Sequence, residues 1–108
     1  MIGEEILKFI AEPDKMTQPE QVNEVISYLN GLVTDLEEKE FEDRLKVNSV
    51  WNELRKTIKT NTETDRAILN TPEYFEHEKT KRSIAKFKRE RSALNHRYEL
   101  LAGKIKHY

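Results

Sequence analysis

The side chains of this chain that could do chemistry are three histidines and many carboxylates. No two of His77, His96 and His107 lie four residues apart, so they do not form a helical zinc pair. Glu73 precedes His77 by four residues, one more than the Glu-x-x-His spacing of di-iron bundles. The chain has no cysteine, which excludes thiolate metal sites and thiol catalysis. We therefore expect no metal and no cofactor.

Several carboxylates crowd one short stretch and invite an acid–base interpretation. On a helix, however, they point to all sides, and a narrow helical protein offers no cleft to desolvate them. The three glycines are too scattered to form a phosphate-binding loop. We therefore expect no enzyme. The carboxylates in question are Glu37, Glu38, Glu40, Glu42 and Asp43.

A basic run is the clearest candidate for binding. Seven of the thirteen residues from 79 to 91 are lysine or arginine. Basic side chains along one outward stripe of a helix could follow the phosphates of a nucleic acid by charge alone. The alternative is a solvated face, or one that pairs with the acidic part of the chain. The predicted nucleic-acid-binding residues are Lys79, Arg82, Lys86, Arg89 and Arg97.

Acidic residues dominate the other half of the chain. The net charge is −1, but residues 1–45 hold four bases and twelve acids, whereas residues 46–108 hold fifteen bases and eight acids. Such asymmetry indicates either a binding partner or two halves that face each other. An acidic row could also occupy a basic groove on another protein, in imitation of DNA. That row consists of Glu20, Glu24, Asp35, Glu38 and Glu42.

The elements that carry these residues are predicted to be helices in a single all-α domain over residues 1–108. Thr17 and Glu20 have the spacing of a capping box, and no proline follows Pro19 until Pro72. The predicted segments are a short helix over 1–12, a long acidic-to-mixed helix over 18–59, a connection over 60–71 that contains a short helix, and a basic heptad helix over 72–107.

The long helix over 18–59 has a polar interruption in its apolar stripe. Glu40, Asp43 and Arg44 occupy the stripe, while Phe41 and Leu45 point to the opposite side. Either the helix breaks near residues 37–41, or a continuous helix carries a polar core layer and a second apolar patch. We favour continuity because the stretch contains no helix breaker.

The last helix repeats its apolar residues with a heptad period, which is typical of a coiled-coil seam. Two long helices with a short connection should fold back as an antiparallel hairpin. If the helix ends are level, Arg91 lies opposite Glu40, and these two with Asp43 form a structural polar layer that fixes the register. The heptad positions are Ile84, Arg91, Tyr98 and Ile105, and Phe87, Leu94, Leu101 and Tyr108.

The outward apolar pair marks a candidate protein-binding surface, formed by Glu38, Phe41, Glu42 and Leu45. The same pair, or the two charged stripes, could join copies of the chain into a homo-oligomer, because one small hairpin core gives marginal stability. No apolar run is long enough to span a membrane, and the acidic start does not match a signal peptide. We therefore expect a cytoplasmic protein that does not associate with membranes.

The tract from Trp51 to Leu101 resembles small helical accessory proteins encoded in phage early and recombination gene clusters. The likeness lies in the order of its parts, and it covers about half of the chain. The resemblance implies a phage protein in the host cytoplasm that acts on DNA metabolism or on a host factor, and it assigns no site residues. Its parts are Trp51-Asn-Glu-Leu-Arg-Lys, Lys59-Thr-Asn-Thr-Glu-Thr-Asp65, Arg66-Ala67-Ile68-Leu69, Glu73-Tyr74 and the basic closing helix.

Together these features predict a non-enzymatic accessory protein that binds a host defence, replication or recombination protein. The alternatives are a nucleic-acid-binding protein that uses the basic stripe, and a structural coiled-coil subunit of a larger assembly. Nucleic-acid binding should weaken steeply with salt, whereas protein binding through an apolar patch should not.

Overall fold

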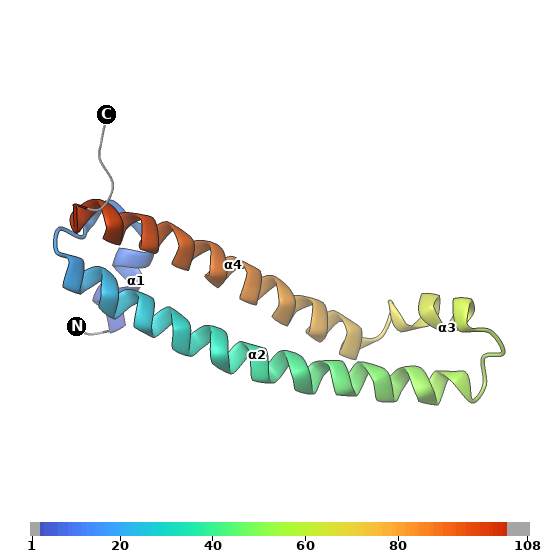
Figure 1. The fold of residues 1–108 in the computed structure, drawn as a ribbon. Coiled ribbons are helices and arrows are strands. Elements are labelled where there is room, and N and C mark those ends of the chain that lie inside the picture. The colour runs from blue at the N-terminus through green and yellow to red at the C-terminus, as the bar shows by residue number, and fades with distance from the viewer. Residues whose placement is uncertain (1–2, 104–108) are drawn as a thin grey trace. The chain divides into compact units, whose positions relative to one another are not determined.

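The computed structural model describes residues 3–103, and these form α-helices, one 3₁₀ turn and no strand. The predicted all-α fold is confirmed, and stretches of the two long helices pack against each other, consistent with the predicted helical hairpin (Figure 1). The helix predicted to continue through residues 37–45 is continuous. The elements are α1 (Gly3–Ala11), η1 (Pro13–Lys15), α2 (Pro19–Arg55), α3 (Asn61–Ile68) and α4 (Pro72–Leu101).

The chain divides into two compact units, each with its own interior. Unit 1 takes its described residues from 3–34 and 86–103, and unit 2 is residues 35–85. Each unit contains one stretch of α2 and one stretch of α4.

Unit 1 has an apolar core. Its fully buried side chains come from the loop after η1, from the first half of α2 and from Leu94 of α4. Ile6, Phe9 and Ile10 of α1 pack against this cluster, so α1 covers it with its apolar face. Burial of these side chains is the main source of stability for the unit. The buried cluster is Met16, Val22, Val25, Leu29 and Leu94.

Local hydrogen bonds explain where α2 begins. The side-chain oxygen of Gln21 accepts hydrogen bonds from the backbone N–H groups of Thr17 (3.1 Å) and Gln18 (3.2 Å). The helix therefore starts at Pro19, and Gln21 takes the accepting role in place of the predicted pair of Thr17 and Glu20.

The long helix α2 ends earlier than the predicted residue 59. It stops at Arg55, whose guanidinium donates to the carbonyl of Ile58 (2.6 Å) and to Asn61 Oδ1 (2.9 Å). Thr60 is extended, and its hydroxyl accepts from the backbone N–H of Glu63 (3.2 Å) as the N-cap of α3. A threonine that caps α3 cannot continue α2, so the chain turns over residues 56–60.

The short helix α3 then runs back beside the end of α2. Trp51 Nε1 donates to Asp65 Oδ1 at 2.8 Å, which ties the two helices together. Thr64 and Ile68 are buried on the inner side of α3. The predicted connection over 60–71 is therefore largely a helix that forms part of the returning arm.

The path of α3 along the end of α2 changes the register between α2 and α4 from the predicted one. Glu40 lies against His77 rather than Arg91, and Arg91 donates instead to Asn30 Oδ1 (2.9 Å). The prediction included a short helix within residues 60–71 but assumed level helix ends, which placed the start of α4 beside the end of α2. Because α3 occupies that stretch of α2, α4 pairs with residues of α2 nearer to its N-terminus.

The closing helix α4 begins after Thr71, whose hydroxyl accepts from the backbone N–H of Tyr74 (3.3 Å). It ends at Leu101, before Gly103, which adopts a left-handed φ of +72°. The predicted extension of this helix to residue 107, with heptad positions Ile105 and Tyr108, lies outside the described residues.

We expect Leu94→Ala to lower the free energy of unfolding by about 2–5 kcal/mol, because it removes a side chain that is 1% exposed from the core of unit 1. Urea unfolding followed by circular dichroism measures this change. Leu7→Ala is the control, since Leu7 is 61% exposed, and its effect should stay within about 0.5 kcal/mol. Equal losses for the two variants would contradict this core.

Candidate functional site

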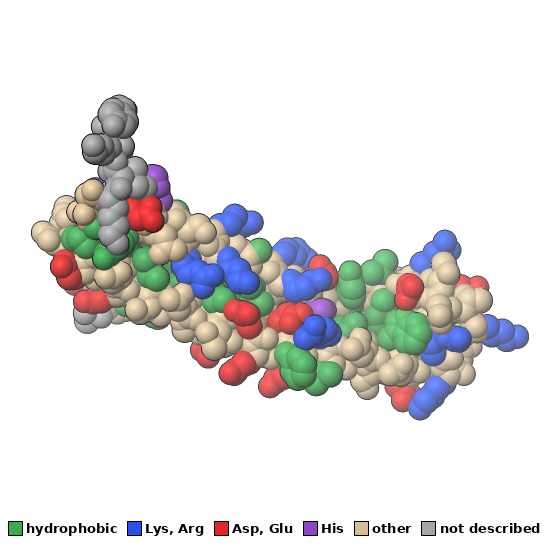
Figure 2. All heavy atoms as spheres, viewed as in Figure 1, with side chains coloured by type: hydrophobic (Ala, Val, Ile, Leu, Met, Phe, Trp, Pro, Cys, Tyr) green, Lys and Arg blue, Asp and Glu red, His purple; other side chains and the backbone are tan. Residues whose placement is uncertain are grey.

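The middle of α2 carries apolar side chains on its outer surface. Phe41 and Leu45 are each 52% exposed and lie about one helical turn apart. Figure 2 shows hydrophobic side chains at the surface there, bordered by charged ones. The guanidinium carbon of Arg44 lies 5.4 Å from the centre of the Phe41 ring, so this cation packs over the exposed aromatic face.

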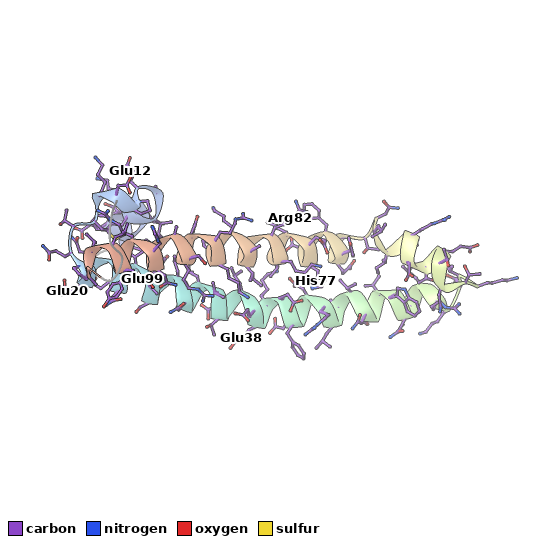
Figure 3. All side chains as sticks on the ribbon, turned by 45° about the horizontal axis from the view of Figure 1, so that its top comes forward. Glu12, Glu20, Glu38, His77, Arg82 and Glu99 are labelled. Atoms are coloured by element: carbon purple, nitrogen blue, oxygen red, sulfur yellow. The ribbon has the colours of Figure 1, made fainter. Side chains whose placement is uncertain are left out.

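Two acidic residues flank this apolar pair. Glu38 and Glu42 are exposed, and neither forms an ion pair or side-chain hydrogen bond with any described residue. In Figure 3, Glu38 points away from α4 on the outer side of α2. Glu38, Phe41, Glu42 and Leu45 therefore share one outward surface of unit 2, as predicted from their spacing; we call this surface the acidic face.

The inner side of the same helical stretch is polar. The carboxylate of Asp43 is 5% exposed and accepts hydrogen bonds from the Thr80 hydroxyl (2.7 Å) and from Lys39 Nζ (2.8 Å). Lys39 also donates to Thr80 Oγ1 at 3.0 Å and lies 3.5 Å from Glu76 Oε2. A buried carboxylate is tolerated because it has partners of this kind.

These partners shift the pKa values of the group. Burial raises the pKa of Asp43, but hydrogen bonds from Lys39 and Thr80, with the charges of Lys39 and Lys46, outweigh it and hold the pKa below its usual value. The hydrogen bond to Asp43 raises the pKa of Lys39. Both groups are therefore charged at neutral pH.

A histidine and a glutamate complete the polar layer. His77 Nε2 lies 2.8 Å from Glu40 Oε1, and Figure 3 shows His77 between α2 and α4. The hydrogen bond from His77 is the main cause that lowers the pKa of Glu40, and nearby cations add to it. Glu40 and Asp43 therefore belong to a polar layer, as predicted, but Arg91 does not.

Sequence reasoning missed the residues on the other side of this layer. His77 and Thr80 stand seven residues before Ile84 and Phe87, which begin the two rows of the predicted heptad. Extending that heptad by one repeat toward the N-terminus would have placed both side chains inward. Because both residues are polar, a heptad recognised by its apolar positions does not include them.

The predicted nucleic-acid-binding residues do not form one uniform group. Lys79 and Arg82 in unit 2 and Lys86 and Arg89 in unit 1 are exposed. Arg97 is only partly exposed, and its guanidinium donates to the carbonyls of Met16 (2.7 Å) and Asp14 (3.2 Å). Arg97 therefore holds the loop that follows η1, because these carbonyls offer acceptors at the edge of the core.

An open hollow of about 440 Å³ lies beside the polar layer of unit 2. Its lining mixes both signs of charge, which gives it no clear preference for an anion or a cation. Within residues 3–103, no group of three histidine, aspartate or glutamate side chains is arranged to hold a metal ion. The lining residues are Lys39, Glu42, Asp43, Lys46, Pro72, Glu73 and Glu76.

Comparisons of the chain with protein-family models, curated proteins and solved structures found no match. Among the helices of the described residues, none has the length and apolar character needed to cross a bilayer.

We expect Asp43→Asn to be about 1–3 kcal/mol less stable than the parent at neutral pH, because it loses a charge-assisted acceptor for Lys39 and Thr80. A carboxylate with a lowered pKa stabilises the fold above its unfolded pKa, and this contribution is lost as the pH falls through the folded pKa. The stability of the variant should therefore fall less between about pH 5 and about pH 2.

Urea unfolding at a series of pH values measures both effects. Glu38→Gln is the matched control, since Glu38 is an exposed carboxylate of the same helix that forms no ion pair or side-chain hydrogen bond with a described residue. If the free energy of unfolding falls by the same amount in Asp43→Asn and in the parent as the pH is lowered, the stabilising role of the Asp43 carboxylate is contradicted.

Proposed function

We propose that this chain is a non-enzymatic accessory protein that binds another protein chain through the acidic face. The observation that carries the proposal is the reversed polarity of α2 in this stretch. Asp43 and Glu40 point inward to the polar layer, while Phe41 and Leu45 are half-exposed on the outside. Large apolar side chains that a helix displays outward in this way are typical of protein-binding surfaces.

The composition of the acidic face suits a protein partner. An aromatic and an aliphatic side chain form its centre, and Glu38 and Glu42 lie at its edge as a polar rim. Interfaces between proteins have this arrangement, in which apolar anchors supply affinity and rim charges supply orientation. The acidic rim favours a partner with basic residues around an apolar contact.

The likeness of the Trp51–Leu101 tract to phage accessory proteins supports a cellular location and a class of target for this binding. On that basis the chain acts in the cytoplasm of a host cell, on a component of defence, replication or recombination. The likeness concerns the order of helices and turns, and the acidic face lies outside that tract.

The experiment replaces Phe41 or Leu45 with a photo-crosslinking amino acid in the cells that make the protein. After irradiation, the protein should form a covalent adduct with another protein chain, because both positions lie at the centre of the acidic face. Tyr28 is the matched control, as an aromatic residue of α2 that is 40% exposed outside this face. With the probe at Phe41, Leu45→Ser should reduce the adduct about tenfold or more.

Adducts are identified by mass spectrometry. The same adducts at Tyr28 as at Phe41, or none at Phe41 and Leu45, would contradict the proposed surface. Circular dichroism of Leu45→Ser checks that the helices remain formed.

A second candidate function is nucleic-acid binding, which the exposure of four basic residues on α4 favours. Lys79, Arg82, Lys86 and Arg89 form no ion pair with any described residue. Arg97 is left out, since its guanidinium is engaged by backbone carbonyls.

If this candidate is correct, the affinity for a short DNA duplex should fall with salt at a logarithmic slope of about −3.6, for four neutralised phosphates. Lys79→Gln with Arg82→Gln should reduce the slope by about two, while Arg97→Gln should leave it unchanged. Fluorescence anisotropy over a salt series measures this, and an absence of binding at low salt would exclude the candidate.

A further inference from the structure

Unit 2 presents a second outward surface, and its charge is opposite to that of the acidic face. Phe75 of α4 is 60% exposed, and Lys79 and Arg82 follow it after about one and two turns. We call Phe75, Lys79 and Arg82 the basic face. Figure 3 shows Arg82 pointing away from α2.

Several charged residues of unit 2 are engaged within the unit, whereas those of the two faces are not. Lys39, Asp43, Glu78 and Lys81 have partners in ion pairs within the unit, and Glu40 is hydrogen-bonded to His77. The acids of the acidic face and the bases of the basic face form no ion pair with a described residue. Each face therefore combines an exposed apolar anchor with charges that are available to an opposite partner.

The spacing along the two helices is complementary. Glu38 and Leu45 are seven residues apart on α2, and Phe75 and Arg82 are seven residues apart on α4, which is about 10.5 Å in each case. In an antiparallel alignment that sets Leu45 opposite Phe75, Arg82 comes opposite Glu38. A parallel alignment would instead set Phe75 against Glu38 and Leu45 against Arg82.

In the same antiparallel alignment Lys79 comes opposite Phe41, one residue from Glu42 and about one turn from the apolar contact. In this orientation Leu45 therefore matches Phe75 and Glu38 matches Arg82, while Lys79 lies next to Glu42. Charges placed in this way orient an encounter and exclude other alignments more than they add affinity.

From this match we infer that the partner of the acidic face is the basic face of a second copy of the same chain. The inference rests on the proposed use of the acidic face for protein binding, and it names the occupant. Leu45 would contact Phe75 of the second copy, and Glu38 would pair with its Arg82. Lys79 of the second copy would lie over Phe41, within reach of Glu42.

The position of the two faces determines the kind of assembly. Glu38 and Arg82 point to opposite sides of unit 2 in Figure 3. A contact between unlike faces on opposite sides is heterologous, so each added copy again presents one free face of each kind. The full chain should therefore associate in an open series whose mean mass rises steadily with concentration.

Sedimentation equilibrium of the full chain, at low and high ionic strength, tests the inference with three double variants. Glu38→Lys with Glu42→Lys, and Lys79→Glu with Arg82→Glu, each place like charges across the contact. Each should require at least about tenfold higher concentration to associate. An equimolar mixture of these two variants should regain the parent's association, because every contact is again between opposite charges.

Lys86→Glu with Arg89→Glu is the matched control, since it makes the same charge change with the same spacing on α4, outside the basic face. It should associate as the parent does. Far-ultraviolet circular dichroism shows whether each variant keeps its helices, and recovery in the mixture shows independently that both reversed variants are folded.

A parent chain that stays monomeric at every concentration, a mass that stops at a dimer, or no recovery in the mixture would overturn the inference. If the parent is monomeric while Phe41 and Leu45 still crosslink to a different protein, the inference fails and the proposed function stands. A monomeric chain whose acidic face crosslinks to nothing contradicts both.

Discussion

The buried carboxylate of Asp43 is the constraint on which the rest of unit 2 depends. A charged group that is 5% exposed is tolerated only where it is hydrogen-bonded, and here Thr80 and Lys39 supply the donors. Sliding α4 along α2 by one turn would leave this charge without Thr80, so the pair selects one register. Because the same helical turn must keep Asp43 inward, it turns Phe41 and Leu45 outward.

The two units use different means to define their interiors. The core of unit 1 is apolar, with Met16, Leu29 and Leu94 almost fully buried, and such burial supplies stability without selecting a precise alignment. Unit 2 buries Asp43, His77, Thr80 and Thr64, and Ile68 is the only buried apolar side chain among its residues. Its interior is therefore well suited to fix geometry, and less suited to supply stability.

Much of this arrangement could be predicted from the sequence, because it follows from helical periodicity alone. The continuity of α2, the inward positions of Glu40 and Asp43 and the outward positions of Phe41 and Leu45 need only a period of about 3.6 residues. The partner of Glu40 could not be predicted in this way, since it depends on where the chain turns. The turn is set by the caps at Thr60 and Thr71 and by the return of α3, which placed His77, not Arg91, beside Glu40. The role of Arg97 depends equally on the path of the loop after η1.

The most direct test of this account is a double-mutant cycle between Asp43 and Thr80, measured by urea unfolding of Asp43→Ala, Thr80→Ala and the double variant at neutral pH. Two residues in direct contact should show a coupling of about 0.5–3 kcal/mol. The account predicts a coupling in this range, because Thr80 Oγ1 and Asp43 Oδ2 lie 2.7 Å apart in the buried layer. If the losses of the two single variants add up to the loss of the double variant within about 0.3–0.5 kcal/mol, the account is contradicted. The two side chains would then not share one contact that determines the register.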